Sequence, residues 1–152
     1  MSGTKARPGG NVYEVFLSHN SKDKSWIDQI AVELDDLGIT VFYDKWDLIP
    51  GRPWQEDVEK ALSESASCAI FVGKAGFGPW QTPEMRVALS RQTRDRTFRV
   101  MPVLLPGGSF DDMPPFLGEN TGVDLAKDFN DREARNRLVA GILGKPPGRP
   151  RP

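Results

Sequence analysis

Short apolar runs alternate with segments of helical period along this chain, and this alternation limits the fold more than any other feature. Val12–Leu17, Ile39–Tyr43 and Ser67–Val72 are rich in β-branched and aromatic residues and predict three strands. Phe98–Leu105 predicts a fourth strand, and a weaker fifth strand lies around Gly122–Leu125. Ser67–Val72 is apolar almost throughout, which is typical of a strand that is covered on both faces.

The segments between these strands predict helices. Asn20 or Ser21 can cap the first helix and Gly38 ends it. Pro53 opens the second, the third covers Thr82–Arg91, and the last runs near Asn130–Leu143. The expected inward face of the first helix consists of Trp26 or Ile27, Ile30, Leu34 and Leu37. That of the second consists of Trp54, Val58, Ala61 and Leu62, and that of the last consists of Leu138, Val139 and Ile142.

Strand–helix alternation with short connections predicts an α/β fold with a parallel sheet that is wrapped on both faces. Pro102 interrupts the fourth strand, and this favours a place near a sheet edge or a bulge over the centre of the sheet. In such folds ligands bind past the carboxyl ends of the strands, near the switch in strand order. The segments expected there are Ser18–Asp23, Asp44–Gly51 and Gly73–Glu84.

The composition excludes several classes of protein. A formal net charge of −1 and a pI of about 5.9 give no general attraction to nucleic acid or to an acidic membrane. One cysteine and one histidine make neither an internal disulfide nor an ordinary zinc site, so no metal is expected. With no apolar leader and no run of about 20 apolar residues, the sequence predicts a soluble cytoplasmic domain without a membrane span.

The two ends of the chain have a different composition from its middle. Residues 1–11 are polar and contain glycine and proline, which predicts a flexible tail. Residues 144–152 are rich in proline, glycine and arginine, which predicts a linker. One folded domain is therefore expected over residues 12–143, with a sensor or partner domain, fused or associated, after residue 152.

The first two loops at the expected edge carry polar and aromatic side chains. Hydroxyl and amide groups beside a helix start suit a phosphate or a ribose, although the segment Ser18–Asp23 taken alone favours simple capping of the helix. In the second loop, an exposed Trp46 indicates a ligand or a protein partner unless its ring folds back onto the domain. The arginines at 91, 94, 96 and 99 are interpreted as a solvated helix end.

Thr82-Pro83-Glu84 is helix-start chemistry, with a cap, a proline at the first helical position and an acid in the first turn. Trp80 stands one turn before Glu84, so the carboxylate could also act beside an aromatic wall. The residues alone leave both roles open.

Three segments together resemble one family. Val15–His19 (VFLSH) resembles the first box of TIR (Toll/interleukin receptor) domains in their prokaryotic form. Gly38–Gly51 resembles the second box with the BB loop that follows it, and Trp80-x-x-x-Glu84 matches the tryptophan and catalytic glutamate of TIR domains that cleave NAD. The resemblance covers residues 12–143.

This resemblance implies a flavodoxin-like fold with a five-stranded parallel sheet in the order 2-1-3-4-5. It also implies cleavage of the nicotinamide–ribose bond of NAD+, by hydrolysis or cyclisation, with NAD+ as substrate and no cofactor. Glu84 would be the catalytic carboxylate. The residues that would bind the substrate are Ser18, His19, Asn20, Asp44, Trp46, Asp47, Leu48 and Trp80.

Enzymatic TIR domains work when assembled, with the BB loop of one protomer completing the site of the next. The assembly residues would be Trp46, Ile49, Pro50 and Gly51, and the partners would be other TIR protomers. A role in antiphage defence fits this behaviour. Many TIR domains are adaptors without activity, so the alternative is a non-catalytic module that assembles through the same loop.

Overall fold

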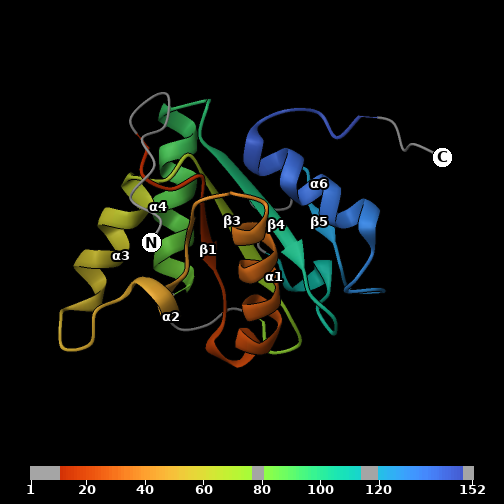
Figure 1. The fold of residues 1–152 in the computed structure, drawn as a ribbon, viewed down its shortest axis with the longest axis horizontal. Helices are drawn as coiled ribbons and strands as arrows, with labels where there is room; N and C mark the ends of the chain where they lie inside the picture. Colours follow the sequence, from red (N-terminus) through yellow and green to blue (C-terminus); the bar gives the residue numbers. More distant parts are fainter. Residues whose placement is uncertain (1–10, 77–80, 114–119, 149–152) are drawn as a thin grey trace.

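The computed structural model describes residues 11–76, 81–113 and 120–148, and of residues 81, 82, 84 and 85 only the backbone. Five strands form one sheet in the order β2-β1-β3-β4-β5, and every pair is parallel (Figure 1). The strands are β1 Val15–Ser18, β2 Val41–Phe42, β3 Ser67–Val72, β4 Arg99–Leu104 and β5 Val123–Asp124. The expected order 2-1-3-4-5 is confirmed.

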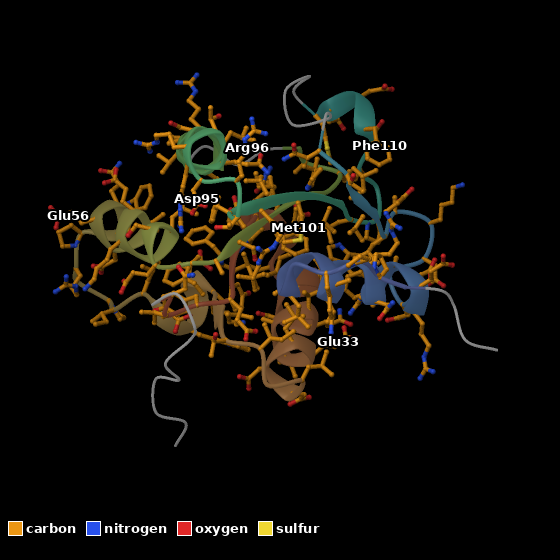
Figure 2. All side chains as sticks on the ribbon, turned by 90° about the horizontal axis from the view of Figure 1, so that it is seen from above. Glu33, Glu56, Asp95, Arg96, Met101 and Phe110 are labelled. Atoms are coloured by element: carbon orange, nitrogen blue, oxygen red, sulfur yellow. The ribbon has the colours of Figure 1, made fainter. Side chains whose placement is uncertain are left out.

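Helices cover both faces of the sheet, as expected for a parallel sheet. Seen from above, α3 and α4 lie on one side of it and α1 and α6 on the other (Figure 2). The helical elements are η1 Ser21–Asp23, α1 Lys24–Asp36, α2 Asp44–Asp47, α3 Trp54–Ser63, α4 Gln81–Arg94, η2 Phe110–Asp112 and α6 Arg132–Leu143.

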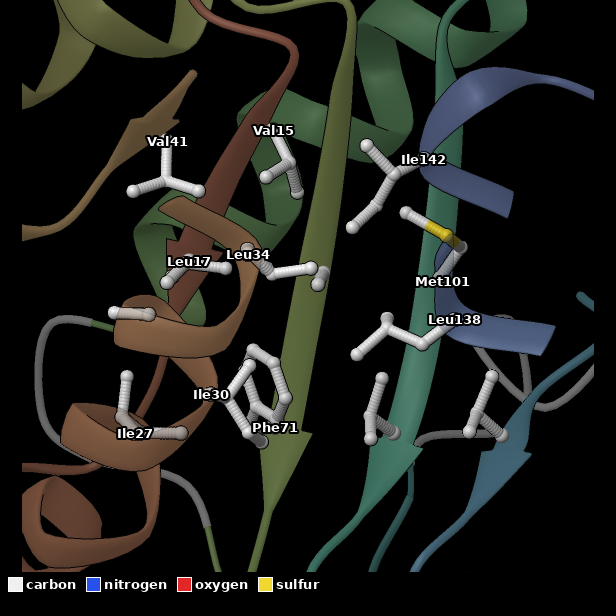
Figure 3. Packing of buried hydrophobic residues seen from close by; sticks show 14 of the residues in the cluster. Val15, Leu17, Ile27, Ile30, Leu34, Val41, Phe71, Met101, Leu138 and Ile142 are labelled. Carbon is white, nitrogen blue, oxygen red and sulfur yellow. The ribbon is translucent and has the colours of Figure 1, made fainter. Parts of the chain in front are cut away.

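The core divides into two layers, one on each face of the sheet. On the first face, Ile27, Ile30 and Leu34 of α1 pack toward the strands, and Leu138 and Ile142 of α6 do so further along (Figure 3). The inward faces predicted for these two helices are confirmed at these positions. Burial of large aliphatic side chains of this kind contributes about 1.5–3 kcal/mol each.

The helix α1 ends one residue earlier than its apolar pattern predicts. Leu37 is the C-cap rather than a core residue, and it is 59% exposed. Gly38 follows with φ +78, a left-handed conformation that turns the chain away from the helix axis. Leu37 therefore leaves the apolar face that Ile27, Ile30 and Leu34 share, and its predicted burial is wrong.

Strand β4 is not an edge strand, although it contains Pro102. It pairs with β3 along its length and with β5 at Val103 and Leu104. The Leu105 N–H donates to Val72 O in the direction of β3, and Leu104 O accepts from Leu125 N–H on the other side. Because backbone groups alternate along a strand, the missing N–H of Pro102 faces the β5 side, just before that ladder begins. This position tolerates the proline.

Candidate functional site

The loop after β1 is buried, and its polar residues are held by specific contacts. Ser18, His19 and Asn20 are 1%, 2% and 6% exposed. The Asn20 side chain accepts a hydrogen bond from Lys22 N–H at 3.0 Å and so caps η1, whereas the N-cap residue of α1 is Asp23 rather than the predicted Asn20 or Ser21. Asn20 Nδ2 also donates to Gly76 O at 3.4 Å. The segments that follow β1 and β3 therefore meet, as expected at the carboxyl edge of the sheet.

The imidazole of His19 is neutral and both of its nitrogens are engaged. Nδ1 lies 3.2 Å from Leu17 O, which can only accept, so Nδ1 carries the proton. Nε2 then accepts from Lys24 Nζ at 3.0 Å. Burial lowers the pKa of His19, and the Lys24 charge acts in the same direction while Asp44 opposes both. A neutral, fully bonded imidazole suits a structural or ligand-orienting role better than proton transfer.

The predicted loop Asp44–Gly51 begins with a short helix, α2, that the sequence did not predict. Lys24 Nζ contacts both oxygens of Asp44, at 2.8 Å and 3.0 Å. Tyr43 N–H donates to Asp47 Oδ2 at 2.8 Å, and Tyr43 OH donates to Asp28 Oδ1 at 2.6 Å. These contacts tie the start of α2 to α1, so this segment has a fixed position.

An apolar cavity of about 310 Å³ lies between the ends of β1 and β2, α2 and α3. Three of the predicted substrate-binding residues line it, namely His19, Asp44 and Leu48. The other lining residues are Phe16, Leu17, Phe42, Trp54 and Val58. Apolar walls with a few convergent polar groups are the usual form of a small-molecule site.

Trp54 lines the cavity, although the sequence did not predict a role for it there. It was expected on the inward face of its helix, but its side chain is 45% exposed and lines the cavity. Its position in the sequence carried a signal, because it opens α3 directly after the loop and Pro53. A first-turn tryptophan at that end of a helix reaches the carboxyl edge of the sheet.

Trp46 and Asp47 do not line this cavity. The Trp46 ring packs edge-on against Tyr43, with ring centroids 5.4 Å apart, yet Trp46 remains 45% exposed. One edge of Trp46 therefore folds back onto the domain, and the rest faces outward. Ile49 beyond it is 62% exposed. Trp46 and Ile49 form an apolar surface beside the cavity, which we call the outer loop surface.

The predicted Trp80–Glu84 pair falls largely outside what the structure describes. Trp80 lies outside the described residues, and Glu84 is described only as a backbone position in the first turn of α4. The helix begins at Gln81, one residue before the predicted Thr82. Because α4 follows β3, its first turn lies at the carboxyl edge of the sheet, and α4 covers the same face as α3.

The basic run after this helix is not simply solvated. Arg91 donates to Leu62 O at 2.7 Å and to Ser65 O at 2.8 Å. Arg99 donates to Gly141 O and Ile142 O, both at 2.9 Å. These guanidinium groups satisfy carbonyls at or just beyond the ends of α3 and α6, so the expectation of a solvated surface is wrong for Arg91 and Arg99. Arg94 and Arg96 are exposed as expected.

The described ranges, residues 11–76, 81–113 and 120–148, hold neither a metal-binding group nor a membrane-spanning helix. They contain no group of three or more His, Cys, Asp or Glu side chains that could hold a metal ion. Within the same ranges, no helix combines the length and the apolarity that crossing a membrane requires.

The fold and its loops match known proteins. A family model described as "TIR domain" matches residues 15–139. The chain belongs to the TIR domain family. This TIR domain is 20% identical to the solved TIR domain of the Toll-related receptor TRR-2 from Hydra magnipapillata, with a TM-score of 0.71 over 86% of this chain and 98% of that one. That likeness concerns the fold.

Two further relatives share more sequence with this TIR domain. The Stimulator of interferon genes protein of Magallana gigas is 27% identical over 125 residues, which are 81% of this chain and 30% of that protein. A protein of Brucella abortus named as a probable 2′ cyclic ADP-D-ribose synthase, TcpB, is 27% identical over 93 residues, 60% of this chain and 37% of its own. The TIR domain thus spans about a third of these curated relatives.

Proposed function

We propose that this TIR domain cleaves the nicotinamide–ribose bond of NAD+, with Glu84 as the key carboxylate. The observation that carries the proposal is the cavity lined by His19, Asp44 and Trp54, on the face of the sheet that α4 covers and at the edge where α4 begins. The relatives named as cyclic ADP-D-ribose synthases support NAD chemistry. The proposed product is linear or cyclic ADP-ribose.

The proposed reaction needs little more than one well-placed carboxylate. The bond between ribose and the cationic pyridinium breaks with nicotinamide leaving as a neutral molecule, so the leaving group requires no acid. Positive charge develops on the ribose as an oxocarbenium ion, and an ionised carboxylate stabilises it. Glu84 lies in the first turn of α4, where the helix dipole favours a negative charge.

The cavity supplies the features that a planar ring and its ribose require. Trp54 and Leu48 offer apolar walls, and an aromatic face attracts a cationic ring. Ser18, Asn20 and Trp80 complete the proposed substrate-binding set from the first and third loops.

Assembly through the outer loop surface is the proposed switch. Trp46 and Ile49 are exposed apolar side chains, Pro50 stiffens the loop, and Gly51 holds φ +93. We propose that other TIR protomers cover this surface, and that a sensor domain after residue 152 brings the protomers together. Depletion of NAD or a nucleotide signal in antiphage defence, in the cytoplasm, would follow.

A second candidate function rests on the same exposed side chains. A scaffold module without activity would also use Trp46 and Ile49 to assemble partners. The two functions differ only in whether the assembled domain consumes NAD+.

Nicotinamide release from NAD+ at high protein concentration tests the proposal. Wild type should release nicotinamide, and Glu84→Gln should lose about a hundredfold or more of the rate. Glu133→Gln is the matched control, because it removes an exposed first-turn acid from another helix, α6. Equal rates for Glu84→Gln and wild type would contradict the role of Glu84. No release from any assembled variant would favour the scaffold.

A further inference from the structure

Asp23 is a buried carboxylate that the proposed reaction has not yet used. Its side chain is 5% exposed, and its Oδ2 atom has no hydrogen-bond partner among the residues that the structure describes. Asp23 is the N-cap residue of α1, yet its side chain makes no capping hydrogen bond. Burial raises the pKa of Asp23. A buried acceptor without a donor costs about 1–3 kcal/mol, so folding alone does not explain this residue.

Asp23 lies where the strand order reverses. From β1 the chain first adds β2 on one side of it. It then crosses to the other side of β1, where β3, β4 and β5 follow in order. The switch point therefore lies between β1 and β3. Ligands of open parallel sheets bind there, past the carboxyl ends of the strands. Asp23 follows β1, and Gly73 directly follows β3.

Asp23 and Gly73 approach so closely that a side chain at position 73 would have to displace the carboxylate. A Cβ atom at Gly73 would lie 2.6 Å from Asp23 Oδ1 and 2.9 Å from Oδ2. Asn20 fixes the same junction through its bond to Gly76 O. The carboxylate is therefore held against the start of the segment that leads to Glu84.

We propose that Asp23 binds the substrate, accepting hydrogen bonds from the hydroxyl groups of a ribose. This inference rests on the proposed function. Two carboxylate oxygens match two neighbouring hydroxyl donors, and dinucleotide-binding folds likewise use an acidic side chain to bind a ribose hydroxyl. A metal cation is the weaker match, because Asp23 belongs to no group of three metal-binding side chains within the described residues.

The proposed role predicts that Asp23→Asn weakens substrate binding without lowering stability. If Asp23 serves the ligand, Asp23→Asn removes a costly buried charge, so the melting temperature stays equal or rises while substrate binding weakens. If Asp23 serves only the fold, the melting temperature falls. Gly73→Ala provides a second variant, since its Cβ would displace the carboxylate without removing it.

The experiment measures the KM for NAD+, the Kd for ADP-ribose and the melting temperature, with Asp35→Asn, an exposed acid of α1, as control. We expect Asp23→Asn to raise KM and Kd about tenfold or more at an unchanged or higher melting temperature. Gly73→Ala should also weaken binding. The double variant Asp23→Asn, Gly73→Ala should bind little more weakly than Asp23→Asn alone, because both changes act on the same carboxylate.

Failure of this inference can be told apart from failure of the proposed function. Active wild type with KM and Kd unchanged in Asp23→Asn would overturn the role of Asp23 and leave NAD+ cleavage standing. Inactive wild type that binds ADP-ribose through Asp23 would keep the inference and overturn the reaction. Neither cleavage nor binding would overturn both.

Discussion

Lys24 Nζ lies 2.8 Å from Oδ1 and 3.0 Å from Oδ2 of Asp44, and this ion pair joins the first residue of α1 to the first residue of α2. The same ammonium donates to His19 Nε2. One lysine thus contacts two residues of the cavity wall, His19 and Asp44, and adds to the lowering of the His19 pKa that burial causes.

Lys24→Met should raise the pKa of His19, because it removes a neighbouring cation that lowers this pKa and leaves burial alone to oppose Asp44. Since His19 is the only histidine, its ring signal in a pH titration by NMR is unambiguous. The free energy of unfolding should fall by about 0.5–1 kcal/mol, as for a partly exposed ion pair. Lys45→Met, which breaks the more exposed pair with Asp28, is the control and should leave the titration in place. An unshifted His19 signal in Lys24→Met would refute the prediction.

Stability should decline in mild acid because of His19. Its pKa is lowered in the folded protein below the ordinary value of 6.5, so the unfolded chain binds the proton more readily. The stabilisation from neutral His19 is complete above about pH 6.5 and is lost as the pH falls through the folded-state pKa. Urea unfolding at pH 7.5 and 5.5 measures this loss, and His19→Gln should show a smaller one. Equal losses in both proteins would assign the pH dependence to other groups.

Arg99→Ala should destabilise the fold by about 1–3 kcal/mol, because it removes a charged donor from Gly141 O and Ile142 O. Arg96→Ala, an exposed arginine three residues earlier, should change the free energy of unfolding by less than about 0.5 kcal/mol. Urea unfolding of the two variants gives the comparison. Similar values for both would mean that the carbonyl contacts of Arg99 contribute little.

Trp54→Ala should raise the KM for NAD+ about two- to tenfold, the usual weight of an aromatic contact, with little loss of stability since the ring is half exposed. Phe110→Ala removes a ring of η2 that is 54% exposed, against 45% for Trp54, and that does not line the cavity, so it serves as control. Steady-state kinetics under assembled conditions provides the measurement. An unchanged KM in Trp54→Ala would remove the cavity from the proposed substrate site.

Ile49→Asp should abolish the dependence of NAD+ cleavage on protein concentration, because it places a charge in the outer loop surface. Gly51→Ala should act in the same direction through strain, since Gly51 holds φ +93. The control is Val32→Asp, at a half-exposed apolar position of α1. Rate against concentration and light scattering measure the effect. Assembly that survives both loop variants would contradict the loop-contact hypothesis.

The sequence predicted those elements whose residues carry a sustained pattern. Ser67–Val72 forms a strand with the predicted bounds because each side chain is apolar or small and both faces are covered. The short helix α2 was missed because four residues, Asp44–Asp47, contain no apolar period. Its position depends on tertiary contacts from Lys24 and Asp28.

The candidate site was predicted in part, through its resemblance to a family motif. His19, Asp44 and Leu48 were found through motif resemblance and meet at the cavity. Asp23 was missed as a site residue, since an acid beside a helix start suggests exposure or capping. The burial of Asp23 depends on the fold, which brings Gly73 from the end of β3 against its carboxylate.

The two outer strands of the sheet, β2 and β5, contain two residues each. Edges this short give an incoming strand almost no unpaired backbone to match, so growth by sheet extension, the route to irreversible fibres, is disfavoured. Protomers of this domain would instead meet through side chains on loops and helices. Contacts of that kind form and break reversibly as the protein concentration changes, so an assembly of such domains can form and then dissociate.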